Sequence, residues 1–84
     1  PSVPMLRLKY DREASNYFFD NGDLTRDLKI AVETLFFTDG IPPEGTGEHF
    51  TLPENMHVWR MLGHAVIYDL TDDVLTVWHV IPLS

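Results

Sequence analysis

The sequence contains no cysteine. This absence excludes disulfide bonds, thiolate metal ligands and a cysteine nucleophile. A chain without cysteine suits a reducing compartment, and we expect the protein to be cytoplasmic.

Long apolar runs are also missing. No stretch approaches the roughly 18–20 apolar residues that a membrane-spanning helix needs. Residues 1–5 lack the basic and apolar regions of a signal peptide. We therefore expect no association with a membrane.

Basic residues are scarce: six stand against thirteen acidic ones, and the net charge is −7. Residues 1–29 hold five of each sign, whereas residues 30–84 hold eight acidic residues and only Arg60. Such a surface repels phosphate backbones. The composition therefore disfavours nucleic-acid binding and favours a basic protein partner, although acidic residues also serve solubility alone.

The 84 residues, 44% of them apolar, are enough for a single small domain spanning residues 1–84. Residues 5–10 alternate between polar and apolar, which predicts a strand with Leu6, Leu8 and Tyr10 on one face. Asp11 is a suitable N-cap for a helix that runs to about Asp20 and ends at Asn21-Gly22.

A second helix is predicted from Asp23, its cap, to near Gly40. Its apolar stripe is Leu24, Leu28, Val32, Leu35 and Phe36. Residues 39–56 then form a long connection rich in glycine and proline, and connections of this length are often functional or mobile.

Three strands are predicted over residues 57–62, 65–70 and 74–81, with turns at Gly63 and Asp72-Asp73. The expected fold is α+β, in the order β-α-α-β-β-β, with a two-helix hairpin packed on a four-stranded antiparallel sheet. We expect Trp59 to be a core or helix-docking residue, and we place these residues in the core: Leu28, Val32, Leu35, Val66, Tyr68 and Trp78.

This element order resembles that of the RelE/ParE superfamily of bacterial toxins. The motifs are similar to those of its YoeB-like branch: Pro43-Glu44-Gly45-Thr46-Gly47, then Leu52, then Trp59-Arg60, then a strand and hairpin over residues 66–73. The resemblance implies a toxin of a type II toxin–antitoxin system that is wrapped by an antitoxin. Members of the superfamily cleave messenger RNA in the ribosome or, in the ParE branch, block DNA gyrase.

The catalytic positions of the family carry other residues here. Its loop carboxylate falls on Phe50, its strand arginine on Ala65, and its terminal His-Tyr pair on Leu83-Ser84. Cleavage of RNA needs a base, an acid and a cation, and the loss of one such group typically costs about 10²–10⁴-fold in rate. We therefore expect a toxin-like protein that acts by protein binding, with its nuclease activity weak or lost.

Two alternatives stay open. The first is an active ribosome-dependent mRNA endonuclease with a rearranged catalytic set: Glu48, His49, Arg60 and His64. In it Glu48 and His49 would form an acid–base pair in the long connection. The simpler interpretation is that Arg60 pairs with a carboxylate on the surface and that His49 and His64 are exposed loop residues. The second alternative is a stand-alone adaptor or homodimer unrelated to toxins.

The remaining histidines, His57 and His79, lie within predicted strands. Alternation puts His79 on one face with Leu75, Val77 and Ile81, so we expect it to be partly buried. No pair of histidines has the helical or tight-loop spacing of zinc sites, and we expect no metal and no cofactor.

Overall fold

The computed structural model describes residues 6–83. In that range the chain forms one five-stranded sheet, two α-helices and two short 3₁₀ turns. The elements are β1 (Arg7–Tyr10), α1 (Arg12–Asp20), α2 (Arg26–Glu33), η1 (Thr34–Phe36), β2 (Glu48–Leu52), η2 (Pro53–Asn55), β3 (Met56–Met61), β4 (His64–Thr71) and β5 (Val74–Pro82).

The α+β class and the element order are confirmed, with one strand more than the pattern predicts. The strand order is β1-β5-β4-β3-β2; neighbours are antiparallel except β1 and β5, which are parallel. The expectation of four antiparallel strands is therefore wrong in two respects. The two helices that follow β1 lead the chain away from it, so β1 can lie beside β5, the last strand, instead of pairing with the next strand in the sequence. The extra strand β2 lies inside the long connection, and all five of its residues are exposed, which leaves no buried face for a pattern to reveal.

Helix α2 begins at Arg26, three residues beyond the predicted cap Asp23. The residue before it, Thr25, is buried, and its hydroxyl donates to the carbonyl oxygen of Asn21 at 2.7 Å. Leu24 consequently lies outside the helix and is 70% exposed. The later part of the predicted stripe is confirmed, because Leu28 and Val32 are completely shielded from solvent.

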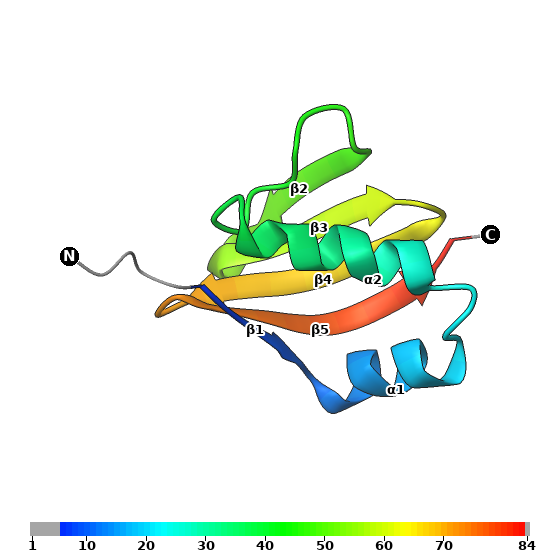
Figure 1. Cartoon of the computed structure of the whole chain (residues 1–84). Helices are drawn as coiled ribbons and strands as arrows, with labels where there is room; N and C mark the ends of the chain where they lie inside the picture. The colour runs from blue at the N-terminus through cyan, green and yellow to red at the C-terminus, as the bar shows by residue number, and fades with distance from the viewer. Residues whose placement is uncertain (1–5, 84) are drawn as a thin grey trace.

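One apolar core joins the helices to one face of the sheet. Figure 1 shows α2 lying over the sheet, roughly along β3 and β4, and α1 lying beside β5. Of the six predicted core residues, five are fully buried, and Trp59 is buried with them. The members of this core are Leu6, Ala14, Phe18, Leu28, Val32, Leu35, Trp59, Met61, Val66, Tyr68, Leu75, Val77 and Val80.

Trp78 is the predicted core residue that the structure places outside the core. Ile67 pairs with His79 but Tyr68 pairs with Val77, so Trp78 is an extra residue in β5, a β-bulge. A bulge reverses the alternation of the residues that follow it. Val77 and Val80 are therefore buried, while Trp78 and His79 are exposed. For the same reason His79 does not share a face with Leu75 and Val77 as predicted; its side chain is 46% exposed, and its Nδ1 lies 3.1 Å from Oε2 of Glu13.

The two edges of the sheet differ. At one edge, β1 pairs only with Val74–Val77 of β5, and α1 packs against β5 with Ala14 and Phe18 buried. The other edge is β2, which lies at the far side of the sheet from α1 (Figure 1). Among the described residues, no helix is long and apolar enough to cross a membrane.

Candidate functional site

The face of the sheet opposite the helices, here called the uncovered face, carries a band of apolar side chains. Residues that pair directly across strands share a face, so the register defines its rows. One row is Glu48, Arg60, Ala65 and Ile81; the next is Phe50, Val58, Ile67 and His79. Phe50 is 44% exposed and Ile81 is 46% exposed. Exposed apolar groups clustered in this way are typical of protein-binding surfaces.

Two positions at which the resemblance places catalytic groups lie on this face. Phe50 is in β2 and Ala65 is in β4, separated by the residues of β3. Leu83 follows β5 and is exposed, and Ser84 lies outside the described residues. Neither Phe50 nor Ala65 can carry a proton or a charge, so these positions supply no acid, base or cation.

Glu48 and Arg60 do meet on the uncovered face. They are cross-strand partners, and Nη1 of Arg60 lies 3.7 Å from Oε1 of Glu48. Both side chains are about half exposed or more, and such surface ion pairs contribute roughly 0–1 kcal/mol. Arg60 thus pairs with a carboxylate at the surface, as the simpler interpretation expects, and this contact leaves its role open to test.

His49 belongs to a different surface. It lies in β2 rather than in a loop, and alternation points its side chain away from that of Glu48. Its Nε2 is 3.0 Å from Nδ1 of His57, and both rings stack near the ring of Tyr68. Burial lowers the pKa of His57, the neighbouring His49 lowers it further, and Asp69 opposes the change. Glu48 and His49 therefore do not form the acid–base pair that the alternative with a rearranged catalytic set requires.

His64 is buried, which corrects the expectation of an exposed loop residue. Its Nδ1 lies 2.9 Å from the carbonyl oxygen of Leu62, and its Nε2 lies 2.8 Å from the hydroxyl of Tyr17. A carbonyl oxygen only accepts, so in the singly protonated ring Nδ1 donates and Nε2 accepts from Tyr17. His64 thus joins α1 to the start of β4. Of the four candidate residues, the structure brings together only Glu48 and Arg60.

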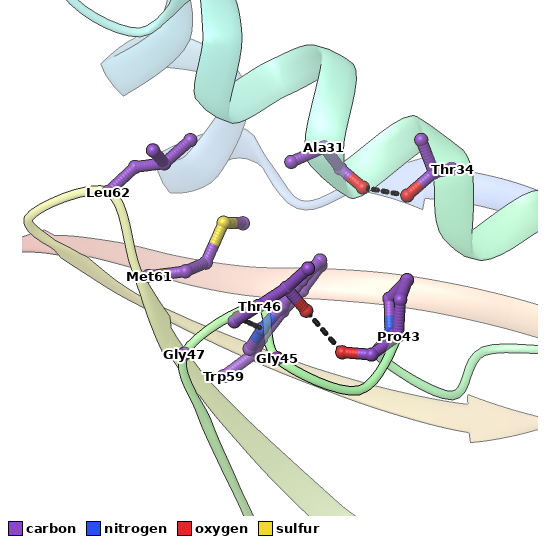
Figure 2. A pocket seen from close by; sticks show the side chains of 9 residues that line it. All are labelled: Ala31, Thr34, Pro43, Gly45, Thr46, Gly47, Trp59, Met61 and Leu62. Atoms are coloured by element: carbon purple, nitrogen blue, oxygen red, sulfur yellow. Dashed lines mark hydrogen bonds between the residues drawn. The ribbon is translucent and has the colours of Figure 1, made fainter.

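A cavity of about 500 Å³ opens on the helix side of the sheet, between α2, the loop of residues 43–47 and the end of β3 (Figure 2). No titratable side chain lines it. The lining is Ala31, Thr34, Pro43, Gly45, Thr46, Gly47, Trp59, Met61 and Leu62. The volume is in the range of ligand pockets, but no set of polar groups converges in it as such pockets require. The cavity is suited to apolar groups and carries no acid–base chemistry.

The long connection that forms one wall of this cavity is anchored to the sheet at two points. The indole Nε1 of Trp59 donates to the carbonyl oxygen of Thr46 at 2.7 Å. The hydroxyl of Tyr68 donates to the carbonyl oxygen of Gly40 at 2.9 Å, a fully buried hydrogen bond. The sequence reveals the connection but not the cavity, because its walls come from residues up to 31 positions apart in the chain.

No three histidine, aspartate or glutamate side chains in residues 6–83 lie close enough together to hold a metal ion. Besides the two apolar surfaces, the polar groups that the structure pairs at the surface are Glu48 with Arg60, His49 with His57, and His79 with Glu13.

Comparison with known proteins identifies the fold. The chain is similar to a class of solved structures with this arrangement of two helices on a mostly antiparallel sheet, those of YoeB. It matches the YoeB–YefM complex from Staphylococcus aureus with a TM-score of 0.65 and 16% identity, covering 94% of this chain and 98% of that one. It matches the YoeB dimer from the same organism with a TM-score of 0.65 and 17% identity, over 95% and 99% of the two chains. No family model matches the sequence. No curated protein matches it.

Proposed function

We propose that this chain is a RelE/ParE-like toxin-family protein of a type II toxin–antitoxin system, which acts in the cytoplasm by binding protein and whose nuclease activity is weak or lost. One observation carries the proposal. The uncovered face has the apolar side chains of Phe50 and Ala65 where the resemblance expects a carboxylate and an arginine.

The chemistry of that face supports protein contact. An RNA strand lying over β2, β3 and β4 would meet Phe50, Val58 and Ile67 beside Arg60, and Glu48 already pairs with that arginine. Two further cations on this face, Arg7 and Lys9, lie in β1 at the opposite edge of the sheet. Phosphoryl transfer needs positive charge where the phosphorane charge develops. A protein partner gains instead from removing the same apolar area from water.

The partner that fits best is an antitoxin-like protein with basic segments. The eight acidic residues after position 29 attract such a chain, while the likeness to the YoeB–YefM complex supports an antitoxin as the partner class. The likeness to the YoeB dimer supports a homodimer in addition.

The binding test uses the product of a small reading frame beside this gene. The wild-type chain should bind it with an affinity measurable by calorimetry. Ile81→Glu, on the uncovered face, should weaken binding at least about tenfold. Ile41→Glu is the matched control, because Ile41 is 63% exposed and lies outside the sheet. Equal affinities of the two variants would show that the face is not used, and the lack of any such neighbour would favour the stand-alone adaptor.

The active endonuclease remains the second candidate, because Glu48 and Arg60 lie together on the uncovered face. The two functions differ in the effect of expression on bacterial growth. We expect the wild-type chain to be tolerated and messenger RNA to stay intact on ribosomes. Growth arrest with cut messenger RNA, abolished by Arg60→Ala, would reject protein binding as the main activity.

A further inference from the structure

Strand β2 forms an edge of the sheet to which no other strand of residues 6–83 is paired on the outer side. Its five residues are all exposed. Its register with β3 runs without a bulge from Glu48 opposite Arg60 to Leu52 opposite Met56. Such an edge presents a row of free N–H and C=O groups to any extended chain.

Most of the devices that usually protect an edge strand are absent from β2. Proteins blunt their edges with lysine, proline, bulges, very short strands or a covering helix. The opposite edge has several of these: β1 has only four residues, Lys9 among them, and α1 packs beside it against β5. The sequence of β2, Glu-His-Phe-Thr-Leu, has no lysine, proline or bulge, and its one formal charge, Glu48, is paired with Arg60 of β3. The contrast marks β2 as a pairing surface.

A second copy of the chain is complementary to this strand. In antiparallel pairing about a two-fold axis at Phe50, the two Phe50 side chains face each other. Glu48 then lies opposite Leu52, and His49 lies opposite Thr51. No like charges meet directly, and the aromatic pair at the centre is among the favourable cross-strand pairs. Phe50 and Leu52, 44% and 45% exposed, would both be covered.

Local charge also favours a second copy over a basic segment at this edge. Glu48 is the single formal charge of β2, and Arg60 pairs with it at 3.7 Å. A basic peptide would therefore gain little here. Asp72 and Asp73 lie in the β4–β5 turn, separated from β2 by β3. Charges farther apart than about 8 Å are screened at physiological salt, so the net charge of −7 on each copy weakens the pairing without preventing it.

We propose that two copies of this chain pair through β2, antiparallel about Phe50, to form one ten-stranded sheet. The two-fold axis keeps both uncovered faces on the same side, so they join into one surface for a protein partner. The inference deepens the proposed function and rests on it for the role of that surface. It gives the homodimer a defined interface and leaves the helices and the cavity outside it.

Cysteine crosslinking tests the register directly, because the chain has no native cysteine. Directly opposed residues have Cβ atoms about 4.5–5.5 Å apart, close to disulfide reach. Phe50→Cys should form a crosslinked dimer under mild oxidation. A mixture of Glu48→Cys and Leu52→Cys chains should give the mixed dimer in preference to either homodimer. Phe37→Cys is the control, since Phe37 is 82% exposed and lies outside the sheet.

Analytical sedimentation of the protein without introduced cysteines tests the dimerisation itself. Phe50→Lys should weaken the dimer at least about tenfold by placing two lysines face to face, whereas Phe37→Lys should leave it unchanged. Added salt should strengthen the wild-type dimer, because screening reduces repulsion between two acidic chains. A monomeric wild-type chain, a dimer insensitive to Phe50→Lys, or no crosslink at position 50 would each overturn the proposal.

The outcomes also separate this inference from the proposed function. A β2-paired dimer that binds no antitoxin would keep the interface and reject the function. A monomer that binds an antitoxin through Ile81 would keep the proposed function and reject the β2 interface. A monomeric wild-type chain in which Phe50→Cys crosslinks only to a bound partner would replace the second copy with strand addition by that partner.

Discussion

Gly47 packs its backbone directly against the carbonyl oxygen of Arg60, so close that a Cβ atom at position 47 would collide with that oxygen. The φ angle of Gly47 is +92°, a left-handed conformation that side chains rarely adopt. The start of β2 and the wall of the cavity both depend on this approach. Gly45, two residues earlier, also has a positive φ angle, but no atom lies within 4 Å of its Cβ position.

This difference predicts unequal costs of substitution. Gly45→Ala should lower the free energy of unfolding by about 1–2 kcal/mol, from backbone strain alone. Gly47→Ala carries the same strain and adds an overpacking cost of about 1–3 kcal/mol. Urea denaturation followed by tryptophan fluorescence would measure both. Equal losses for the two variants would mean that the backbone contact is not tight in solution.

A second prediction concerns the stripe of α2. Leu28→Ala should cost about 2–4 kcal/mol, because this side chain is 1% exposed at the centre of the core. Leu24→Ala is the matched control: its side chain is 70% exposed, and surface changes are usually within about 0.5 kcal/mol. Denaturant melts of the two variants should therefore separate clearly. A loss below about 0.5 kcal/mol for Leu28→Ala would contradict the helix packing.

The third prediction is a pH dependence of stability caused by His57. Its pKa in the folded state is lowered, chiefly by burial and then by His49, while Asp69 acts in the opposite direction. Below the usual histidine pKa of about 6.5, the unfolded chain therefore binds a proton that the folded chain resists. His57 therefore leaves the free energy of unfolding at its full value above that pH and lowers it as the pH falls below.

The variants His57→Gln and His49→Gln test this relation. The free energy of unfolding at pH 7.5 and pH 5.5 should differ less in His57→Gln than in the wild-type chain. His49→Gln should also reduce the difference, because it removes the second positive charge. An unchanged difference in His57→Gln would assign the effect to other groups.

The fourth prediction is that free RNA binds negligibly at physiological salt. Residues 30–84 present eight carboxylates and one arginine, and that arginine is already paired. Titration with labelled single-stranded RNA at about 150 mM salt should show no saturation, whereas a basic polypeptide should bind and weaken as salt rises. Micromolar RNA binding with a steep salt dependence would show that the five basic residues of positions 1–29 form a patch that outweighs the acidic half.

Much of this protein could be predicted from local pattern. The alternation of Leu6, Leu8 and Tyr10 predicted β1. The spacing of Leu28, Val32 and Leu35 predicted the buried stripe of α2 and η1. These features follow from the two periods of side-chain direction, which neighbouring residues determine. The motifs around residues 43–73 pointed to the fold of YoeB, which the solved structures support.

The features that pattern could not supply depend on contacts between distant residues. β2 was hidden because an exposed edge strand has no buried face, and only its pairing with β3 defines it. The bulge at Trp78 reversed the expected orientation of His79, since an extra residue is visible only against the partner strand. His64 is buried because Tyr17 of α1, 47 positions away, bonds to its ring.

The sequence by itself determined the acidic charge, the lack of cysteine, the α+β class, the order of most elements and the apolar character of Phe50 and Ala65. The tertiary structure alone decided that these two residues share the uncovered face, that Glu48 and His49 point to opposite sides, and that a cavity opens beside α2. The physical reason is the same in each case. Composition and periodicity are properties of one segment, whereas a surface or a site is formed where segments far apart in the chain meet.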